Sequence, residues 1–258
     1  MCGLTRWTAG FYCPAIVRAH HERTYTLTNF DPEVTKYVQD ILLRKTDRDK
    51  QRKVGLSQLS NECTKCLAEA MVTGEGHQSE FNAGAIIGTA IHEYLEHRNQ
   101  DELALKEFNG LVDVIPGYGD IRSTTDLYRV DKKNLIDFKT STRDKMDKYF
   151  KDWDAGKPNA TLSRYFRQAT GYAYMMEDEV EKVSICFIAR DAQIIERDVK
   201  AISIPYDESI AVGMLNRAKR LWEWLEQNNY DWTQLNSADG CYVCEKLRPY
   251  AKPPLDEL

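Results

Sequence analysis

One short apolar segment carries both an acid and an amine. In NLIDFKTST, residues 134–142, Asp137 and Lys139 are two positions apart, so in a strand they project from the same face. A second acid, Asp126, precedes them in the strand-like segment STTDLYRV. Neighbouring strands can bring the two carboxylates together, and such carboxylates repel each other unless a cation lies between them. Oxygen ligands of this kind favour Mg²⁺ or Mn²⁺, and Lys139 is placed to stabilise negative charge on a phosphate.

Two helical segments offer further polar side chains to such a site. In GTAIHEYLE, residues 88–96, His92 and Glu96 are four apart and therefore share a helix face. In QATGY, Gln168 and Tyr172 have the same spacing. His92 is a candidate to complete the metal shell, and Glu96 is a possible further member of the site. Gln168 and Tyr172 could hold a phosphate or a base.

Two CxxC pairs form a separate candidate metal site. Cys63 and Cys66 lie in NECTKC, and Cys241 and Cys244 lie in GCYVCE. In a reducing compartment this pattern indicates a metal site before it indicates disulfides. By spacing alone, four thiolates suit a tetrahedral zinc ion and a 4Fe-4S cluster equally well. Such a link, joining Cys66 to Cys241, would close a loop of nearly the whole domain and constrain the unfolded state by ~4–5 kcal/mol. The remaining cysteines are expected to be a core residue, Cys186, and two free thiols, Cys2 and Cys13.

The periodicity of apolar residues predicts one α/β domain with a mixed sheet and flanking helices. The expected helices cover residues 32–49, 57–72, 79–98, 162–176 and 207–227. The expected strands cover residues 104–115, 121–130, 134–141, 183–190 and 194–204. No linker is apparent, so we expect a single domain over residues 1–258. It would contain a helical N-terminal part (about 1–78), a catalytic core (about 79–206) and a C-terminal helix with the cysteine tail (207–258).

Composition narrows the class of protein. The chain is 42% hydrophobic and 29% charged, with a formal net charge of −5, so it is not expected to coat nucleic acid by bulk electrostatics. A local basic groove is compatible with that total. The apolar runs are too short to span a membrane, and the N-terminus lacks the features of a secretory signal. We therefore expect a cytoplasmic protein.

The ordered motifs resemble the RecB-like branch of the PD-(D/E)xK nuclease superfamily. That branch has a helical GxxxHxxxE, a GxxD strand, a DxK strand and a QxxxY helix, and the resemblance covers about residues 57–172. Serine stands at the glycine position of GxxD, at Ser123. An alternative alignment places Asp120 as the acid, but Asp126 is preferred because it lies in a clear strand.

The resemblance implies a restriction-endonuclease-like core and a metal-dependent DNA exonuclease, similar to CRISPR-associated and phage enzymes. The implied catalytic residues are Asp126, Asp137, Lys139, Gln168 and Tyr172. The implied ligands of Mg²⁺ or Mn²⁺ are His92, Asp126, Asp137 and the main-chain carbonyl of Phe138. Related nucleases with cysteines at both ends favour a 4Fe-4S cluster over zinc on Cys63, Cys66, Cys241 and Cys244.

The same resemblance suggests the partners and leaves alternatives open. The expected substrate is DNA with free ends or single-stranded DNA, in the cytoplasm of a prokaryote or of a phage-infected host. A homo-oligomer or a recombination-protein partner is possible. Basic residues near the motifs are favoured as DNA contacts: Arg143, Lys145, Arg164 and Arg167. A second basic group is the alternative: Arg44, Lys45, Arg48, Arg52 and Lys53. The alternative functions are a non-catalytic cysteine-metal DNA-binding module and a structure-specific endonuclease.

Overall fold

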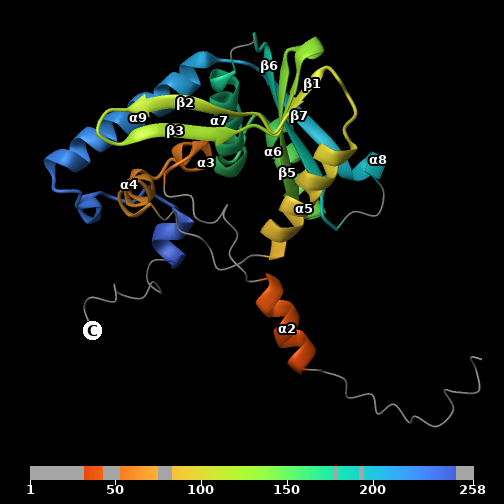
Figure 1. The fold of residues 1–258 in the computed structure, drawn as a ribbon, viewed down its shortest axis with the longest axis horizontal. Helices are drawn as coiled ribbons and strands as arrows, with labels where there is room; N and C mark the ends of the chain where they lie inside the picture. The colour runs from red at the N-terminus through yellow and green to blue at the C-terminus, as the bar shows by residue number, and fades with distance from the viewer. Residues whose placement is uncertain (1–31, 43–52, 75–82, 177–178, 192–194, 248–258) are drawn as a thin grey trace, which may run out of the picture. The chain divides into compact units, whose positions relative to one another are not determined.

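The structure is a computed structural model that describes residues 32–42, 53–74, 83–176, 179–191 and 195–247 (Figure 1). The chain divides into two compact units, Met1–Arg44 and Lys45–Leu258. In the first unit the described part is helix α2 (Pro32–Leu42), where Lys36 and Asp40 form an exposed ion pair of 2.9 Å. The predicted extension of this helix to residue 49 lies outside the described residues. So do Cys2, Cys13, Arg44, Lys45, Arg48 and Arg52. The assignment of residues 1–258 to one domain stays a prediction.

The second unit contains the predicted mixed sheet. Its strands are β1 (Ala104–Lys106), β4 (Leu127–Arg129), β5 (Asn134–Ser141), β6 (Lys182–Ala189) and β7 (Val199–Pro205). They lie in the order β1-β4-β5-β6-β7, with β5 and β6 parallel and the other pairs antiparallel. Two further strands, β2 (Asn109–Ile115) and β3 (Gly119–Thr124), form a separate two-stranded sheet. The predicted α/β class with a mixed sheet flanked by helices is confirmed.

The separate sheet arises from a bend in one long hairpin. The predicted strands 104–115 and 121–130 are wrong as continuous strands. The first is interrupted between β1 and β2 and the second between β3 and β4, and the two interruptions lie opposite each other. On one side Glu107 has a left-handed backbone with φ of 45°, which an extended strand cannot contain. Opposite it, Thr125 and Asp126 lie between β3 and β4, and the Thr125 N–H donates to the Phe108 carbonyl at 2.9 Å. The bend takes β2 and β3 out of the main sheet.

Seven helices of the described part surround the two sheets. They are α3 (Leu56–Leu59), α4 (Thr64–Thr73), α5 (Ala83–Arg98), α6 (Arg143–Asp154), α7 (Ala160–Met175), α8 (Ile195–Asp198) and α9 (Glu208–Gln227). The predicted helix 57–72 is wrong as one helix, since it breaks between Ser60 and Cys63. Helix α6 was not predicted. Its charged sequence RDKMDKYFKDWD fully buries only Met146, and Tyr149, Phe150 and Trp153 are partly buried on the same face. The predicted strand 194–204 begins instead with α8 and becomes extended at Val199.

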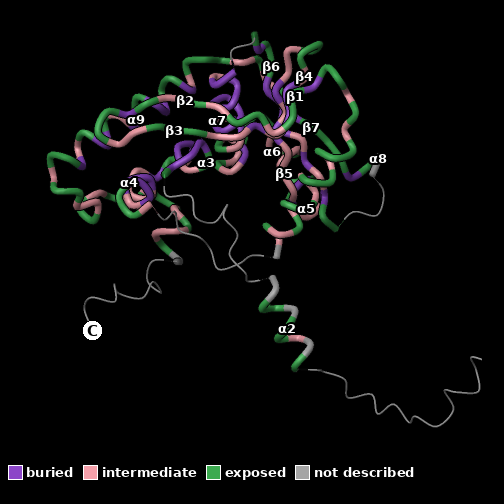
Figure 2. Tube along the Cα trace, viewed as in Figure 1, coloured by how far each residue is buried: buried purple, intermediate pink, exposed green. Residues whose placement is uncertain are grey.

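The core lies between β5–β6 and helix α7, where Figure 2 shows buried residues concentrated. Phe187 of β6 is fully buried and packs against Tyr149 and Phe150 of α6 and Tyr165 of α7, with ring centroids 5.3–6.2 Å apart. At Gly171 of α7, an added Cβ would lie 2.5 Å from the side chain of Leu56. The absence of a side chain there lets α3 pack closely on α7. In the described part of the chain, the helices are too short or too polar to cross a membrane.

Candidate active site

Helix α5 lies against strand β5 and brings His92 to the sheet. At Gly88, an added Cβ would lie 3.1 Å from Thr140 Oγ1 of β5. This glycine of the GTAIHEYLE motif therefore permits a close approach of helix and strand. One turn further along α5, the His92 ring meets the Phe138 ring edge-on, with centroids 6.0 Å apart. Phe138 and Thr140 thus project toward α5.

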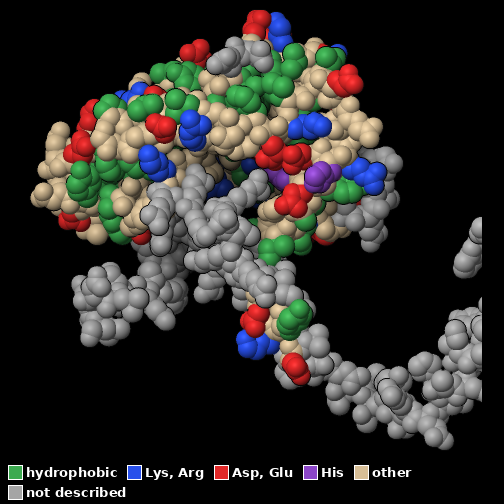
Figure 3. Space-filling model, viewed as in Figure 1, with side chains coloured by type: hydrophobic (Ala, Val, Ile, Leu, Met, Phe, Trp, Pro, Cys, Tyr) green, Lys and Arg blue, Asp and Glu red, His purple; other side chains and the backbone are tan. Residues whose placement is uncertain are grey.

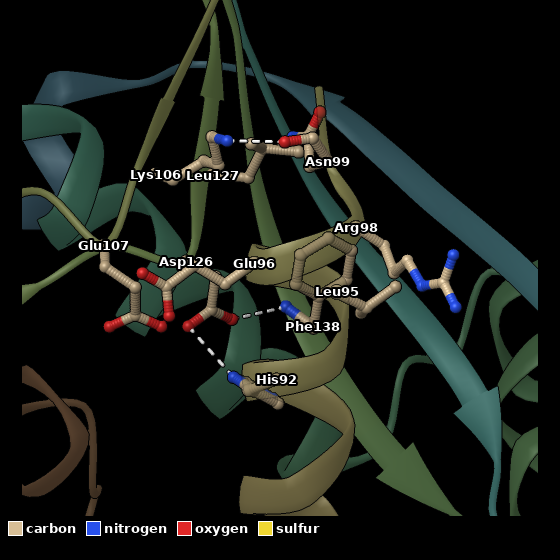
Figure 4. Close-up of a pocket in the computed structure, with 10 residues that line it drawn as sticks. All are labelled: His92, Leu95, Glu96, Arg98, Asn99, Lys106, Glu107, Asp126, Leu127 and Phe138. Carbon is tan, nitrogen blue, oxygen red and sulfur yellow. Dashed lines mark hydrogen bonds and ion pairs between the residues drawn. The ribbon is translucent and has the colours of Figure 1, made fainter. Parts of the chain in front are cut away.

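Asp126 lies beside β5, immediately before the first residue of β4 that pairs with β5. In β4, Leu127 pairs with Ile136, so the same register places Asp126 opposite Asp137, one step beyond the ladder. There the Phe138 N–H donates to Asp126 Oδ2 at 2.6 Å, and Asp126 Oδ1 lies 3.3 Å from His92 Nδ1 (Figure 4). Because the N–H and C=O of a strand residue point to the same side, the Phe138 carbonyl also faces this gap. Its predicted role as a main-chain ligand stays a prediction.

The Asp126–His92 contact shifts both pKa values. His92 donates a hydrogen bond to the Asp126 carboxylate, which raises the pKa of His92 above its ordinary value, although burial acts against this. Burial would raise the pKa of the Asp126 carboxyl, but the His92 hydrogen bond, nearby positive charge and the Phe138 N–H hold it below its usual range. Asp126 is therefore an anion at neutral pH, positioned to receive a cation.

Asp137 and Lys139 project from the other face of β5, toward α7. Asp137 is 1% exposed, and Lys139 Nζ lies 2.8 Å from both of its carboxylate oxygens. The amine also lies 5.2 Å from the centre of the Tyr165 ring of α7. Burial raises the pKa of Asp137 to about 7, with the Asp126 charge adding to this and the Lys139 charge opposing it. The structure thus brings the predicted acid–amine pair together.

Gln168 and Tyr172 of α7 lie beside this pair. The Gln168 Nε2 donates to Tyr172 Oη at 2.5 Å, and both side chains are buried. Burial raises the pKa of Tyr172 well above its usual value, and the charges of Asp137 and Asp126 raise it further. Tyr172 therefore keeps its proton at any physiological pH. Both residues border a cavity of about 650 Å³ that extends under the β2–β3 hairpin to two basic side chains, Lys53 and Arg122.

Glu107 joins the site without having been predicted. Its carboxylate, that of Asp126 and a ring nitrogen of His92 offer ligand atoms within 4.8 Å of one another (Figure 4). The sequence could have indicated Glu107 only if the pairing of the two strands had been known. Lys106 pairs with Leu127, so Glu107 comes opposite Asp126, but without the register it is one acid among many.

The site opens into two cavities. One, of about 320 Å³, and another, of about 300 Å³, are both bordered by His92, Glu107, Asp126 and Phe138. Glu96, the possible member of the site, borders the first cavity and is exposed. In the space-filling view, acidic and histidine side chains gather on the part of the surface near α5, with basic side chains at the margin (Figure 3).

The predicted DNA-contacting residues have different surroundings. Arg143 forms an ion pair with the buried Asp198. Arg167 binds Glu62 at 2.7 Å and the Ser60 carbonyl at 3.0 Å. The other two are exposed: Lys145 on α6 and Arg164, whose guanidinium lies 5.7 Å from the Tyr165 ring centre. Their role in DNA binding stays a prediction.

The four predicted cluster cysteines are also brought together. Cys63 and Cys66 at the start of α4 meet Cys241 and Cys244, and their sulfur atoms lie within 4.8 Å of one another. Cys186, predicted as a core residue, is half-buried in β6, and burial raises its pKa to about 11.

Comparison with known proteins places the fold among exonucleases. No protein-family model matches the chain, and no curated protein sequence is significantly similar to it. The crystal structure of a phage-related exonuclease from Haemophilus somnus 129PT has a TM-score of 0.50 at 17% identity, covering 69% of this chain and 96% of that one. An alkaline exonuclease from Laribacter hongkongensis has a TM-score of 0.46 at 15% identity, covering 76% and 96%. The first of these likenesses shows the same fold.

Proposed function

We propose that this protein is a divalent-metal-dependent DNA exonuclease of the RecB-like type. The observation that carries the proposal is the convergence on β5 of two pairs, Asp126 with His92 and Asp137 with Lys139. The two carboxylates are near enough for Asp126 to raise the pKa of Asp137. Residues from α5, the bend before β4, and β5 all contribute, and convergence of several roles in one place is what distinguishes a site from a chance motif. The shared fold with a phage-related exonuclease supports the same class of enzyme.

The residues fit a hard divalent cation. A histidine nitrogen and the Glu107 and Asp126 carboxylates surround a space that opens into two cavities. Beside them is the Asp137 carboxylate, which is 1% exposed and lies 2.8 Å from Lys139 Nζ. His92, Glu107, Asp126 and Asp137 would hold Mg²⁺ or Mn²⁺. Such an ion, when bound, lowers the pKa of water and offsets negative charge on a phosphate.

The chain's own groups would orient the phosphodiester. The Lys139 ammonium is held by Asp137 and Tyr165, so it presents a fixed positive charge to a phosphate oxygen. Tyr172 retains its proton and, with Gln168, offers polar atoms at the edge of the 650 Å³ cavity. That cavity leads to Arg122 and Lys53, which would contact the backbone of a DNA strand. In this proposal the enzyme digests DNA from its ends, in the cytoplasm of a prokaryote or of a phage-infected host.

A digestion assay with matched variants tests the proposal. Linear duplex, single-stranded and circular DNA are incubated with Mg²⁺ or Mn²⁺ and the wild type, Asp137→Asn or Lys139→Ala. Both variants should lose at least about a hundredfold in rate, while Asp154→Asn and Lys157→Ala, on exposed residues of and after α6, should not. Digestion of linear but not circular DNA is expected. Cleavage of circles would favour the endonuclease alternative, and binding without digestion would favour the non-catalytic module.

A further inference from the structure

The four clustered cysteines differ in geometry from what the family resemblance implies. Cys63 Sγ lies 3.6 Å from Cys244 Sγ, and Cys66 Sγ lies 3.6 Å from Cys241 Sγ and 3.5 Å from Cys244 Sγ. All four sulfur atoms lie within 4.8 Å of one another. The spacing along the chain left zinc and a 4Fe-4S cluster equally possible, so these distances are the first observation that distinguishes them.

The distances fit one tetrahedral ion and not an iron–sulfur cluster. Four sulfurs that are each about 2.3 Å from a single zinc ion lie about 3.8 Å from one another. In a 4Fe-4S cluster each cysteine binds a different iron, so the cluster itself separates the sulfurs by on the order of 6 Å. A separation of that size cannot occur in a group confined to 4.8 Å. A 2Fe-2S cluster fails for the same reason across its two irons.

Two disulfides would explain these sulfur–sulfur distances less well than a single central ion. A disulfide joins two sulfurs at about 2.05 Å and excludes a third from bonding. Here Cys66 Sγ is equally close to two sulfurs, those of Cys241 and Cys244. A shared arrangement of this kind is what a central ion produces, because every ligand is then a neighbour of every other.

Protein contacts place the two cysteine segments next to each other. Cys63 is the N-cap residue immediately before α4 and is 2% exposed, and its sulfur accepts the Ala238 N–H at 3.5 Å. The Lys65 amine donates to the Thr233 carbonyl at 2.9 Å. Gly240, with φ of +69°, turns the chain into the single π-helical turn Val243–Leu247 that carries Cys244. The site is thus closed by four protein ligands, the form that structural zinc sites take.

We propose that Cys63, Cys66, Cys241 and Cys244 bind one Zn²⁺ ion as a closed structural site. The ion ties the start of α4 to the segment after α9 and adds to the hydrogen bonds that already join these two segments. This replaces the iron–sulfur cluster that the resemblance implies. The proposal concerns metal content and folding, so it stands or falls independently of the nuclease proposal.

Metal analysis of the full chain provides the test. The protein is expressed in medium supplied with both iron and zinc and is purified without oxygen. We expect about one zinc ion per chain, a colourless solution and no acid-labile sulfide. A brown protein with about four irons and four sulfides, or one mononuclear iron, would overturn the proposal.

Protein isolated without metal is tested by titration. Anaerobic addition of Co²⁺ should give the intense visible bands of a tetrahedral thiolate site at about one ion per chain, and Zn²⁺ should displace them. Failure of both ions to bind would overturn the proposal. Cys241→Ser should lose the bound zinc, whereas Cys186→Ser, which removes a thiol outside the group, should keep it. Because the wild-type measurement decides the metal, a variant that fails to fold does not obscure the result.

Discussion

The two groups of candidate metal ligands in this protein differ in the chemistry of their ligand atoms and in how open they are to solvent. The group around Asp126 offers oxygen and nitrogen atoms, and it borders two cavities. The cysteine group offers four sulfur atoms, of which Cys63 is almost fully buried and the others are half-buried. Hard ligands with open positions suit an exchangeable Mg²⁺ or Mn²⁺ that meets a substrate. Soft ligands with all positions filled suit a permanent ion that holds the fold.

The two groups also differ in the elements of the fold that hold their residues in place. The open group depends on a bend in a hairpin, where Glu107 adopts a left-handed backbone beside Asp126. The closed group depends on a helix start and a tight turn, both far from that bend in the sequence. Loss of the ion should therefore chiefly reduce activity at the open group and chiefly reduce stability at the closed group. The following predictions test that contrast, beginning with the largest expected effect.

Removal of each ion should separate activity from stability. Omitting Mg²⁺ and Mn²⁺ should abolish digestion of DNA and lower the thermal unfolding transition only by the small amount expected for a weakly bound, exchangeable ion. Cys66→Ser should lower the free energy of unfolding by about 3 kcal/mol or more, because the binding energy of a structural zinc ion is also folding energy. Cys186→Ser should change it by no more than about 1 kcal/mol. Equal losses of stability in the two cysteine variants would contradict the contrast.

Glu107→Gln should weaken the open site without affecting the fold. The substitution preserves size but removes one anionic ligand, so about 10- to 100-fold less activity is expected at low Mg²⁺. Raising the Mg²⁺ concentration should recover part of the loss. Glu102→Gln, which changes an exposed acid of the preceding loop, is the matched control. Full activity of Glu107→Gln at every metal concentration would remove Glu107 from the site.

Asp137 should make the metal-free protein less stable as pH rises. Its pKa is raised by burial to about 7, above the value of about 4 in an unfolded chain. The folded state therefore binds this proton more tightly. The stabilisation is complete below the unfolded pKa and is lost as pH rises through the folded pKa, by on the order of 2–4 kcal/mol.

Asp137→Asn provides the comparison for that pH dependence. An amide cannot ionise, so urea unfolding of this variant without divalent ions should vary less between about pH 5 and 8 than that of the wild type. Its stability at the upper pH should equal or exceed that of the wild type, although it is inactive. Identical pH profiles for the two proteins would show that Asp137 does not carry the effect.

Arg122→Ala should have the smallest effect of the set. Arg122 borders the 650 Å³ cavity with Gln168 and Tyr172, where it would contact a phosphate of the DNA strand. We expect KM for DNA to rise about 3- to 10-fold with little change in kcat, and the salt dependence of binding to weaken. Lys157→Ala removes an exposed positive charge from another loop and should leave KM unchanged. A fall in kcat alone would instead place Arg122 among the groups that act on the reacting phosphate.

Much of the candidate site could be predicted from local sequence. Alternating apolar residues around Asp137 and Lys139 specify a strand, and side chains two apart on a strand share a face whatever surrounds them. Four-residue spacing placed His92 with Glu96, and Gln168 with Tyr172, on single helix faces. The strands β5 and β6 and the helices α7 and α9 were predicted within a few residues for the same reason.

The sequence did not reveal the features that depend on distant segments. The bend that breaks the predicted strands 104–115 and 121–130 follows from packing β2 on α7, where Gly110 lies close to Met175. Glu107 becomes a neighbour of Asp126 only through the β1–β4 register. Helix α6 was missed for a different reason: Met146, Tyr149, Phe150 and Trp153 have helical spacing, but they stand among many charged residues.

By itself, the sequence determined which atoms are available for chemistry: carboxylates, an amine, an imidazole and four thiols at spacings that fix their local directions. It could not determine how far apart the cysteine sulfurs lie, because Cys63 and Cys244 are brought together by contacts between segments distant along the chain. Local conformation is set by neighbouring residues, whereas the separation of distant ligands is set by packing. The proposal of a single ion instead of a cluster rests on that separation, which only the tertiary structure supplies.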